Sequence, residues 1–253
     1  MRPNGVQELI AAGRTAVNAW LTVPSPYVAE VLSHAGFDCV TVDLQHGMFG
    51  VDGAVSLLQG ISAGPAVPMA RCPALDAHVI GKLLDAGAYG IICPSVDTAA
   101  QARDFVAACR YPPTGRRSYG PARGLLVGGP DYVEHADEII QTWAMIESAA
   151  ALADLAEIVA TPGLDGVYVG PNDLALSLGE RPGATDPPPA VAAALTRVLE
   201  VAHGAGKLAG VFCADGDRAR DLAAAGYDLV TPGNDVTMLR DSAVGRIAAA
   251  RAG

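Results

Sequence analysis

The chain has 253 residues, of which 51% are hydrophobic and 17% charged, and its 17 basic and 27 acidic residues give a formal net charge of −10. This length suits one large core, and the hydrophobic content argues against disorder over most of the chain. The acidic balance argues against a nucleic-acid-binding protein, which needs a broad basic face, but anionic substrates remain open because one arginine can reverse the field inside a cleft.

Eight apolar runs that favour β-strands alternate with helical patterns rich in Ala and Leu. The runs cover residues 15–23, 38–44, 67–72, 90–94, 139–146, 166–170, 208–213 and 228–231. This alternation predicts an α/β fold with a parallel sheet, and near-continuous apolar strands predict burial on both faces. Eight units favour a closed (β/α)8 TIM barrel as one domain over residues 1–253. An open doubly wound sheet is the alternative, but no GxGxxG pattern follows the first run.

Two segments interrupt the alternation of strands and helices. Residues 111–137 contain YPPTGRRSYGPARGLLVGGP, and residues 179–189 contain GERPGATDPPP. Their glycines and prolines disfavour regular structure, and long loops inside compact domains are often functional. We expect either segment to cover the catalytic rim of the barrel or to contact a neighbouring subunit.

The cysteines and the absence of targeting segments indicate a cytoplasmic protein. None of the five cysteines forms CxxC or another zinc-binding spacing, so we expect them to be reduced and mostly buried. The N-terminal stretch MRPNGVQELIAAGR lacks the apolar core of a signal peptide. No apolar run approaches the roughly 20 residues of a membrane span.

Asp43 lies at the end of the strand-like run at 38–44, and His46 lies just beyond it. Side chains at the carboxyl ends of barrel strands line the catalytic rim. At this spacing a turn can bring the imidazole near the carboxylate, which would orient the ring and tune its basicity. A surface turn with a solvated aspartate is the alternative.

Arg71 ends the third strand-like run, where a guanidinium is costly unless it is paired or faces a cleft. Its planar fork suits a substrate carboxylate or oxyanion, and a structural ion pair is the alternative. Asp85 lies near the end of the third helical pattern, where a carboxylate does not complement the helix dipole. Solvation at the surface is its default interpretation.

Glu147 and Asp173 end the runs IIQTWAMIES and LDGVYVGPND. Two hard oxygen ligands on one rim suggest a divalent metal such as Mg²⁺ or Mn²⁺. Either carboxylate could instead cap the helix that follows it, and the motif GPNDLALSLG makes Asp173 look particularly like a cap. Taken alone, each residue leaves both interpretations open.

The strand-end residues, in this order, resemble those of the HpcH/HpaI aldolase family of class II, metal-dependent pyruvate aldolases. The matching motifs cover nearly the whole chain and include AGFDCVTVDLQHG, the strand of Arg71, KLLDAGAYGIICP, YPPTGRRSYGPAR, MIES and GVYVGPNDLALSLG. Each motif is weak by itself, but the set is specific. The resemblance implies a (β/α)8 barrel of the phosphoenolpyruvate/pyruvate type, assembled as a homo-oligomer (a trimer or hexamer) with the C-terminal helix in the contacts.

The resemblance also implies a metal site and a substrate site. Glu147 and Asp173 would hold a divalent cation, Mg²⁺, Mn²⁺ or Co²⁺, which a 2-oxo acid chelates through its carboxylate and keto oxygens. The positions expected to contact that substrate are Arg71, Gln45, Gly170, Pro171 and Asn172. Relatives often have Glu where this chain has Gln45, and some carry Gln where it has Met145. The second departure removes a polar group near the 2-oxo acid and leaves substrate preference open.

The catalytic histidine of the family falls on His46, with Asp43 beside it. Asp85 falls on a carboxylate that supports this histidine across or near a subunit contact. The histidine, or a metal-positioned water, would move the proton of the 4-hydroxyl, and retro-aldol cleavage through a stabilised enolate would give pyruvate and an aldehyde. Lys82 and Lys207 lie away from strand ends, which fits a metal mechanism better than a Schiff base.

Two other functions stay open at this point. A citrate-lyase-like or condensing enzyme could use a metal-bound enolate on the same barrel, although a CoA substrate would need a larger basic entrance than a net charge of −10 supports. A non-catalytic metabolite-binding protein is disfavoured, because the Glu, Asp, His and Arg set is retained. The sequence leaves the aldehyde unspecified.

Overall fold

The computed structural model describes residues 2–183 and 186–252. Eight parallel strands close into a barrel in sequence order, with β8 hydrogen-bonded to β1. They are β1 (Ala16–Leu21), β2 (Cys39–Asp43), β3 (Val67–Arg71), β4 (Gly90–Cys93), β5 (Gln141–Ile146), β6 (Gly166–Val169), β7 (Leu208–Cys213) and β8 (Leu229–Pro232). Seven of the eight predicted runs contain one of these strands, and β8 extends one residue beyond the eighth run. The predicted barrel is confirmed, and the open sheet is wrong.

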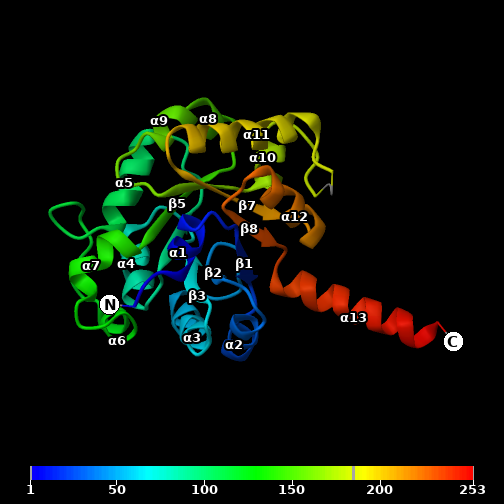
Figure 1. Cartoon of the computed structure of the whole chain (residues 1–253), viewed down its shortest axis with the longest axis horizontal. Helices are drawn as coiled ribbons and strands as arrows, with labels where there is room; N and C mark the ends of the chain where they lie inside the picture. Colours follow the sequence, from blue (N-terminus) through cyan, green and yellow to red (C-terminus); the bar gives the residue numbers. More distant parts are fainter. Residues whose placement is uncertain (1, 184–185, 253) are drawn as a thin grey trace.

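Helices form a layer around the barrel (Figure 1). They are α1 (Gly5–Ala11), α2 (Pro26–His34), α3 (Val51–Ser62), α4 (Ala77–Asp85), α5 (Ala99–Cys109), α6 (Ala122–Gly128), α7 (Tyr132–Ile139), α8 (Ala149–Ala153), α9 (Leu155–Val159), α10 (Pro171–Ser177), α11 (Pro189–Gly204), α12 (Gly216–Ala225) and α13 (Asp235–Arg251). Polar side chains cap several of them: Asp76 accepts from the first turn of α4, and Thr98 and Gln101 form a capping box on α5. None of the helices in the described ranges is long and apolar enough to cross a membrane.

Almost every strand residue is buried, because helices cover the outside of the barrel and side chains fill the inside. This explains why the strands read as continuous apolar runs. Large interior rings need small neighbours: a Cβ on Gly210 would lie 2.7 Å from the ring of Tyr168. The five cysteines are free and buried, as predicted.

Segment 111–137 differs from its prediction in structure and in position. It contains α6 and most of α7, and it connects α5 to the start of β5, so it lies at the N-terminal end of the barrel. Contacts with the chain start confirm this place, since the backbone N–H of Arg2 donates to Gly128 O at 2.8 Å. Figure 1 shows α6 and α7 beside the N-terminus. The segment therefore does not cover the rim of its own barrel.

Segment 179–189 lies at the opposite end, where it follows α10. Helix α11 begins at Pro189, and the described residues before it from Glu180 form no helix or strand, as predicted. Residues 184–185 lie outside the described part of the chain. The N–H of Gly183 donates to Asn172 Oδ1 at 2.9 Å, which ties this segment to α10 at the rim.

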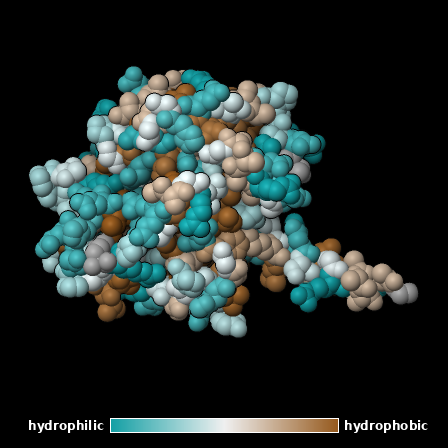
Figure 2. Space-filling view, in the orientation of Figure 1, coloured by the Kyte–Doolittle hydropathy of each residue, from teal (hydrophilic) through white to brown (hydrophobic). Residues whose placement is uncertain are grey.

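The C-terminal helix α13 leaves the barrel and extends away from it (Figures 1 and 2). Of its residues, Asp235 alone is buried. The Asp235 carboxylate accepts hydrogen bonds from the N–H groups of Thr22 and Val23 and from the Thr22 hydroxyl, which fixes the start of the helix to the end of β1. Four large apolar side chains further along are exposed by 48–71%: Val236, Leu239, Val244 and Ile247.

Candidate active site

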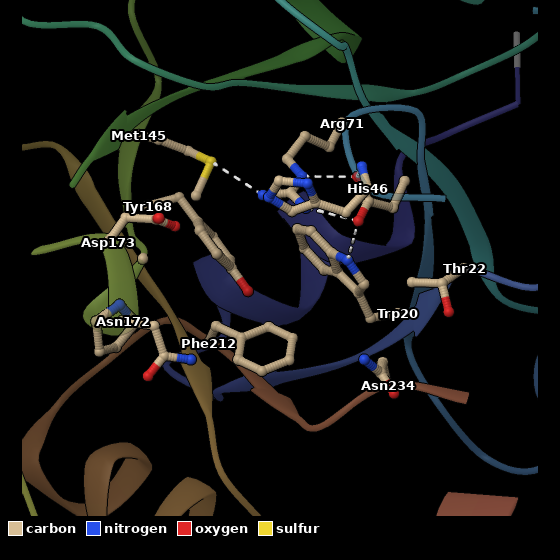
Figure 3. Close-up of a pocket in the computed structure, with 13 residues that line it drawn as sticks. Trp20, Thr22, His46, Arg71, Met145, Tyr168, Asn172, Asp173, Phe212 and Asn234 are labelled. Carbon is tan, nitrogen blue, oxygen red and sulfur yellow. Dashed lines mark hydrogen bonds and ion pairs between the residues drawn. The ribbon is translucent and has the colours of Figure 1, made fainter. Parts of the chain in front are cut away.

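A pocket of about 210 Å³ opens at the carboxyl ends of the strands, the rim where active sites of this fold are found (Figure 3). Its lining residues are Trp20, Thr22, Asp43, His46, Arg71, Met145, Tyr168, Gly170, Pro171, Asn172, Asp173, Phe212 and Asn234. Seven strands or strand ends thus contribute to one cavity. Most of the residues that the sequence predicted to be functional line this one cavity.

Sequence reasoning missed several of the walls of this pocket. Thr22 directly follows β1 and Asn234 lies two residues after β8, so the strand-end rule could have found them. Trp20, Tyr168 and Phe212 sit inside strands and are indistinguishable in sequence from core residues. Trp20 stacks on Tyr168 with ring centroids 5.7 Å apart and meets Phe212 edge-on at 5.6 Å, so the three rings form one apolar surface in the pocket.

A buried ion pair joins Arg71 and Asp43. Arg71 Nε donates to Asp43 Oδ1 at 2.8 Å, and Nη2 donates to Oδ2 at 2.6 Å. Nη1 has only the Met145 sulfur, at 3.9 Å, as a partner among the described residues. Arg71 is therefore both the structural ion pair and the pocket residue that the sequence left as alternatives. One of its nitrogens remains available to a ligand.

Asp43 is held ionised by its neighbours. Burial alone would raise the pKa of its carboxyl group, but the hydrogen bonds and charge of Arg71 outweigh burial, and the Trp20 indole N–H and the His46 backbone N–H add to them. The net result is a pKa below the usual value. Because Trp20 donates to Asp43 Oδ2 at 3.0 Å and lies 4.9 Å from the guanidinium of Arg71, it supports both partners.

His46 lies at the pocket wall but does not pair with Asp43 as expected. Asp43 Oδ1 accepts from the backbone N–H groups of Gln45 and His46, at 3.0 and 3.3 Å, and so shapes the turn instead of orienting the imidazole. The His46 side chain is exposed. The expectation that Asp43 orients the ring is corrected for a physical reason: Arg71 and Trp20 occupy the carboxylate.

Glu147 is positioned by the end of β4. Ser95 there has φ 55°, the one positive value outside glycine in the described residues, and its N–H donates to Glu147 Oε1 at 2.7 Å. Glu147 Oε2 is buried and has no hydrogen-bond partner in the described ranges. Burial raises the pKa of Glu147; the Ser95 N–H opposes this, and the nearby Asp173 carboxylate raises it further.

Gly170 leaves space beside the unpartnered oxygen. A Cβ at this position would lie 3.0 Å from Glu147 Oε2 and 3.1 Å from the terminal carbon of Met145. Asp173 is exposed on the first turn of α10 and lines the pocket. In the described chain, no group of three or more His, Cys, Asp or Glu side chains could hold a metal by itself. The donor set is two carboxylates, which fits a hard cation that keeps water or substrate oxygens as further ligands.

Neither carboxylate is a helix cap. Ser148, the residue after Glu147, caps α8 by accepting from Ala151 N–H. Helix α10 has Gly170 at its N-cap and no side-chain cap hydrogen bond, although Asp173 stands in its first turn. The capping interpretation is therefore wrong for both residues.

Three expected residues are not among those that line the pocket: Glu147, described above, Asp85 and Gln45. Asp85 is at the end of α4, just before β4 begins, and so at the opposite end of the barrel from His46; it pairs with Arg117 at 2.9 Å. Gln45 is half-buried next to the pocket but does not line it, and its Oε1 is buried without a partner in the described chain. Within one chain, Asp85 cannot support His46.

The comparisons with known proteins agree with this geometry. Residues 17–242 match the family model described as HpcH/HpaI aldolase/citrate lyase. The chain is 42% identical over 249 residues to a hydroxypyruvate/pyruvate aldolase of Rhizorhabdus wittichii, covering 98% of this chain and 99% of that protein. It is 35% identical over 240 residues to a 4-hydroxy-2-oxo-heptane-1,7-dioate aldolase of Salmonella arizonae, covering 93% and 90%. A crystal structure of a protein of this family from Burkholderia cenocepacia superposes with a TM-score of 0.90 at 32% identity, covering 98% of both chains.

Proposed function

The chain belongs to the HpcH/HpaI aldolase/citrate lyase family, and on that premise we propose that it works with a divalent metal held by Glu147 and Asp173. It is an aldolase, a carbon–carbon lyase that cleaves 4-hydroxy-2-oxo acids to pyruvate and an aldehyde or joins them in the reverse direction. Because the relatives are named as enzymes, a non-catalytic metabolite-binding protein is disfavoured.

The observation that carries the metal proposal is the unpartnered oxygen of Glu147. An ionised oxygen buried without a partner is costly unless a ligand binds it. Ser95 occupies the other oxygen, Gly170 leaves space beside this one, and Asp173 adds a second carboxylate. When bound, a cation such as Mg²⁺, Mn²⁺ or Co²⁺ would polarise the keto group of the substrate as a Lewis acid.

The chain's own residues supply binding and proton transfer. The free Nη1 of Arg71 faces the pocket and would donate to the keto oxygen, where negative charge develops as the bond between C3 and C4 breaks. His46 would take the proton of the 4-hydroxyl, so that the aldehyde leaves and the electron pair passes to the enolate. A proton returned to C3 then gives pyruvate. Gly170, Pro171 and Asn172 would position the substrate at the first turn of α10, with Gln45 behind the turn.

We also propose that the protein is a homo-oligomer, a trimer or hexamer, with α13 in the contacts. The exposed apolar side chains of α13 find no cover in the chain itself. Asp85 would then serve the His46 of a second copy, since one oxygen of its carboxylate is bound to Arg117 and the side chain is 29% exposed. The free cysteines support a cytoplasmic location.

Mixing two inactive variants tests the shared site. We expect His46→Ala and Asp85→Asn each to lose most activity alone and to recover part of it when they are refolded together, because some sites then combine an intact His46 with an intact Asp85. Light scattering would establish the oligomeric state. No recovery in a mixed oligomer would contradict the role of Asp85.

The aldolase activity itself is tested by pyruvate release from 4-hydroxy-2-oxo acids, coupled to lactate dehydrogenase. We expect turnover that EDTA abolishes and that Mg²⁺, Mn²⁺ or Co²⁺ restores. Turnover in excess EDTA would contradict the metal assignment and leave the aldolase assignment intact.

A further inference from the structure

A second, smaller cavity adjoins the main pocket. The two share Pro171, Asn172 and Phe212 as walls, and the smaller one has a volume of about 90 Å³. It lies among the first turn of α10, Gly183 and Pro187, and the first turn of α12. A water needs only about 10–15 Å³ of such space, so several substrate atoms fit. The shared residues place this cavity directly beside the main pocket.

The walls of the second cavity are mostly apolar. Leu195 of α11 and Leu222 of α12 contribute to them. The Asn172 amide oxygen is already used by Gly183 N–H, at 2.9 Å, and this bond holds segment 179–189 against α10. Arg218 is the one charged side chain that lines the cavity in the described part of the chain.

Arg218 offers a guanidinium that pairs with no carboxylate in the described part of the chain. It is half-buried in the first turn of α12, and its backbone N–H donates to Asp215 Oδ1 at 2.8 Å as part of the helix cap. Its guanidinium has no hydrogen bond or ion pair in the described ranges. The contrast with Arg220 on the same helix is direct, since that guanidinium pairs with Asp217 at 2.7 Å and Asp221 at 3.2 Å.

On the basis of the aldolase function proposed above, we propose that this cavity binds the far end of the aldehyde part of the substrate, and that Arg218 selects aldehydes whose far end carries an anion. The apolar walls suit a short methylene chain. The free N–H donors of the guanidinium suit a carboxylate or a phosphate, both of which accept paired hydrogen bonds from arginine. The partly buried setting strengthens that attraction.

The test compares charged and neutral aldehydes of matched size as acceptors of pyruvate. One pair is 4-oxobutanoate and butanal, and the other is glyceraldehyde 3-phosphate and glyceraldehyde. The variant is Arg218→Gln, and the matched control is Arg220→Gln, which removes the same charge from the same helix outside the cavity. Thermal melts establish that both variants fold.

We expect Arg218→Gln to lower kcat/KM for the charged aldehyde of at least one pair by about 10- to 100-fold, because only a charged aldehyde loses charge-assisted hydrogen bonds. For the neutral aldehyde of the same pair, kcat/KM should stay within about 2-fold of the wild-type value. Arg220→Gln should change neither value. A loss of kcat/KM confined to 4-oxobutanoate identifies a carboxylate as the anion that Arg218 binds, and a loss confined to glyceraldehyde 3-phosphate identifies a phosphate. Equal losses for charged and neutral aldehydes, or no loss in either pair, would overturn the proposal.

Failure of the aldolase assignment would look different, because the wild-type protein would then turn over none of the four aldehydes. In that case the binding of 4-oxobutanoate and glyceraldehyde 3-phosphate is measured directly by saturation-transfer NMR. Binding by the wild type that Arg218→Gln loses would support the anion subsite. Equal binding by both proteins, or none by the wild type, would overturn it.

Discussion

The two ends of the barrel use buried guanidinium groups in different ways. At the N-terminal end, Arg110 donates to Ile140 O, Gly163 O and Asp165 Oδ2, at 2.9–3.1 Å. At the rim, Arg71 pairs with Asp43 through two nitrogens but leaves the third facing a thioether and the pocket. Arg110 is thus bound by groups of its own chain, whereas Arg71 keeps one nitrogen available to a ligand.

The second buried arginine of the N-terminal end is also bound within the chain, although its Nε has no hydrogen-bond partner in the described residues. Arg117 binds Asp85 and the Tyr132 hydroxyl and lies 4.4 Å from the ring centroid of Tyr111. At the rim, a carboxylate oxygen, Glu147 Oε2, is buried without a partner in the described residues and lies beside the space at Gly170. Groups left unsatisfied cost stability, so they persist where a ligand is to bind. The comparison predicts that the rim carries the chemistry and that the N-terminal end is structural.

Glu147→Gln tests the comparison with the largest expected effect. The change removes the charge of the unpartnered oxygen, and we expect pyruvate release to fall on the order of 10³-fold and Mn²⁺ binding to be lost, because the cation loses a charged ligand. Isothermal titration measures the Mn²⁺ affinity. The control is Glu138→Gln, an exposed carboxylate at the N-terminal end, which should leave both quantities unchanged.

Replacing an arginine by lysine at each end should separate the two roles. Arg71→Lys keeps the charge but loses the forked donors, so we expect kcat to fall about 10²-fold. Arg110→Lys should lower the free energy of unfolding by about 1–3 kcal/mol and leave kcat unchanged. Steady-state kinetics and urea unfolding measure the two quantities. A fall in kcat for Arg110→Lys as large as that for Arg71→Lys would break the distinction between the ends.

Gly170→Ala tests whether the space beside Glu147 matters. The added methyl would lie 3.0 Å from Oε2, so we expect Mn²⁺ affinity to fall about 10-fold while the fold is kept. Gly81→Ala is the matched control, because a Cβ at that position meets nothing within 4 Å. Unchanged Mn²⁺ affinity in Gly170→Ala would place the cation elsewhere.

The smallest expected effect concerns acid stability. The lowered pKa of Asp43 means that its contribution to folding is complete above the unfolded-state value of about 3.9 and is lost as the pH falls through the folded-state value. Asp43→Asn should be less stable by about 1–2 kcal/mol at pH 7. The difference in free energy of unfolding between the wild type and Asp43→Asn should narrow as the pH falls from about 5 to 3. Urea unfolding at several pH values measures it, and a gap that stays constant or widens would contradict the pKa direction.

The strands and strand-end residues could be predicted because the barrel buries both faces of each strand and collects their carboxyl ends on one rim. The place of Arg71, Glu147 and Asp173 at that rim follows from this rule, but their roles do not. The place of segment 111–137 was also available in principle, since a segment that follows a helix in this fold lies at the end opposite the rim. Sequence offered no signal for the aromatic walls Trp20 and Phe212, which read as core.

Contacts between distant residues set the rest of the site. Asp43 is three residues from His46, yet its carboxylate binds Arg71 and Trp20, which lie 28 and 23 positions away. Local spacing could not reveal that competition. The unpartnered state of Glu147 Oε2 likewise depends on Ser95 taking the other oxygen, across the neighbouring strand.

Solvent deuterium exchange at C3 of pyruvate, followed by NMR, tests the central claim most directly, because it requires only the rim and no aldehyde. We expect exchange with Mg²⁺ or Mn²⁺ present, loss of exchange in EDTA, recovery on adding metal back, and no exchange in Glu147→Gln. Exchange that continues in EDTA or in Glu147→Gln would contradict a metal held by this carboxylate as the source of the chemistry.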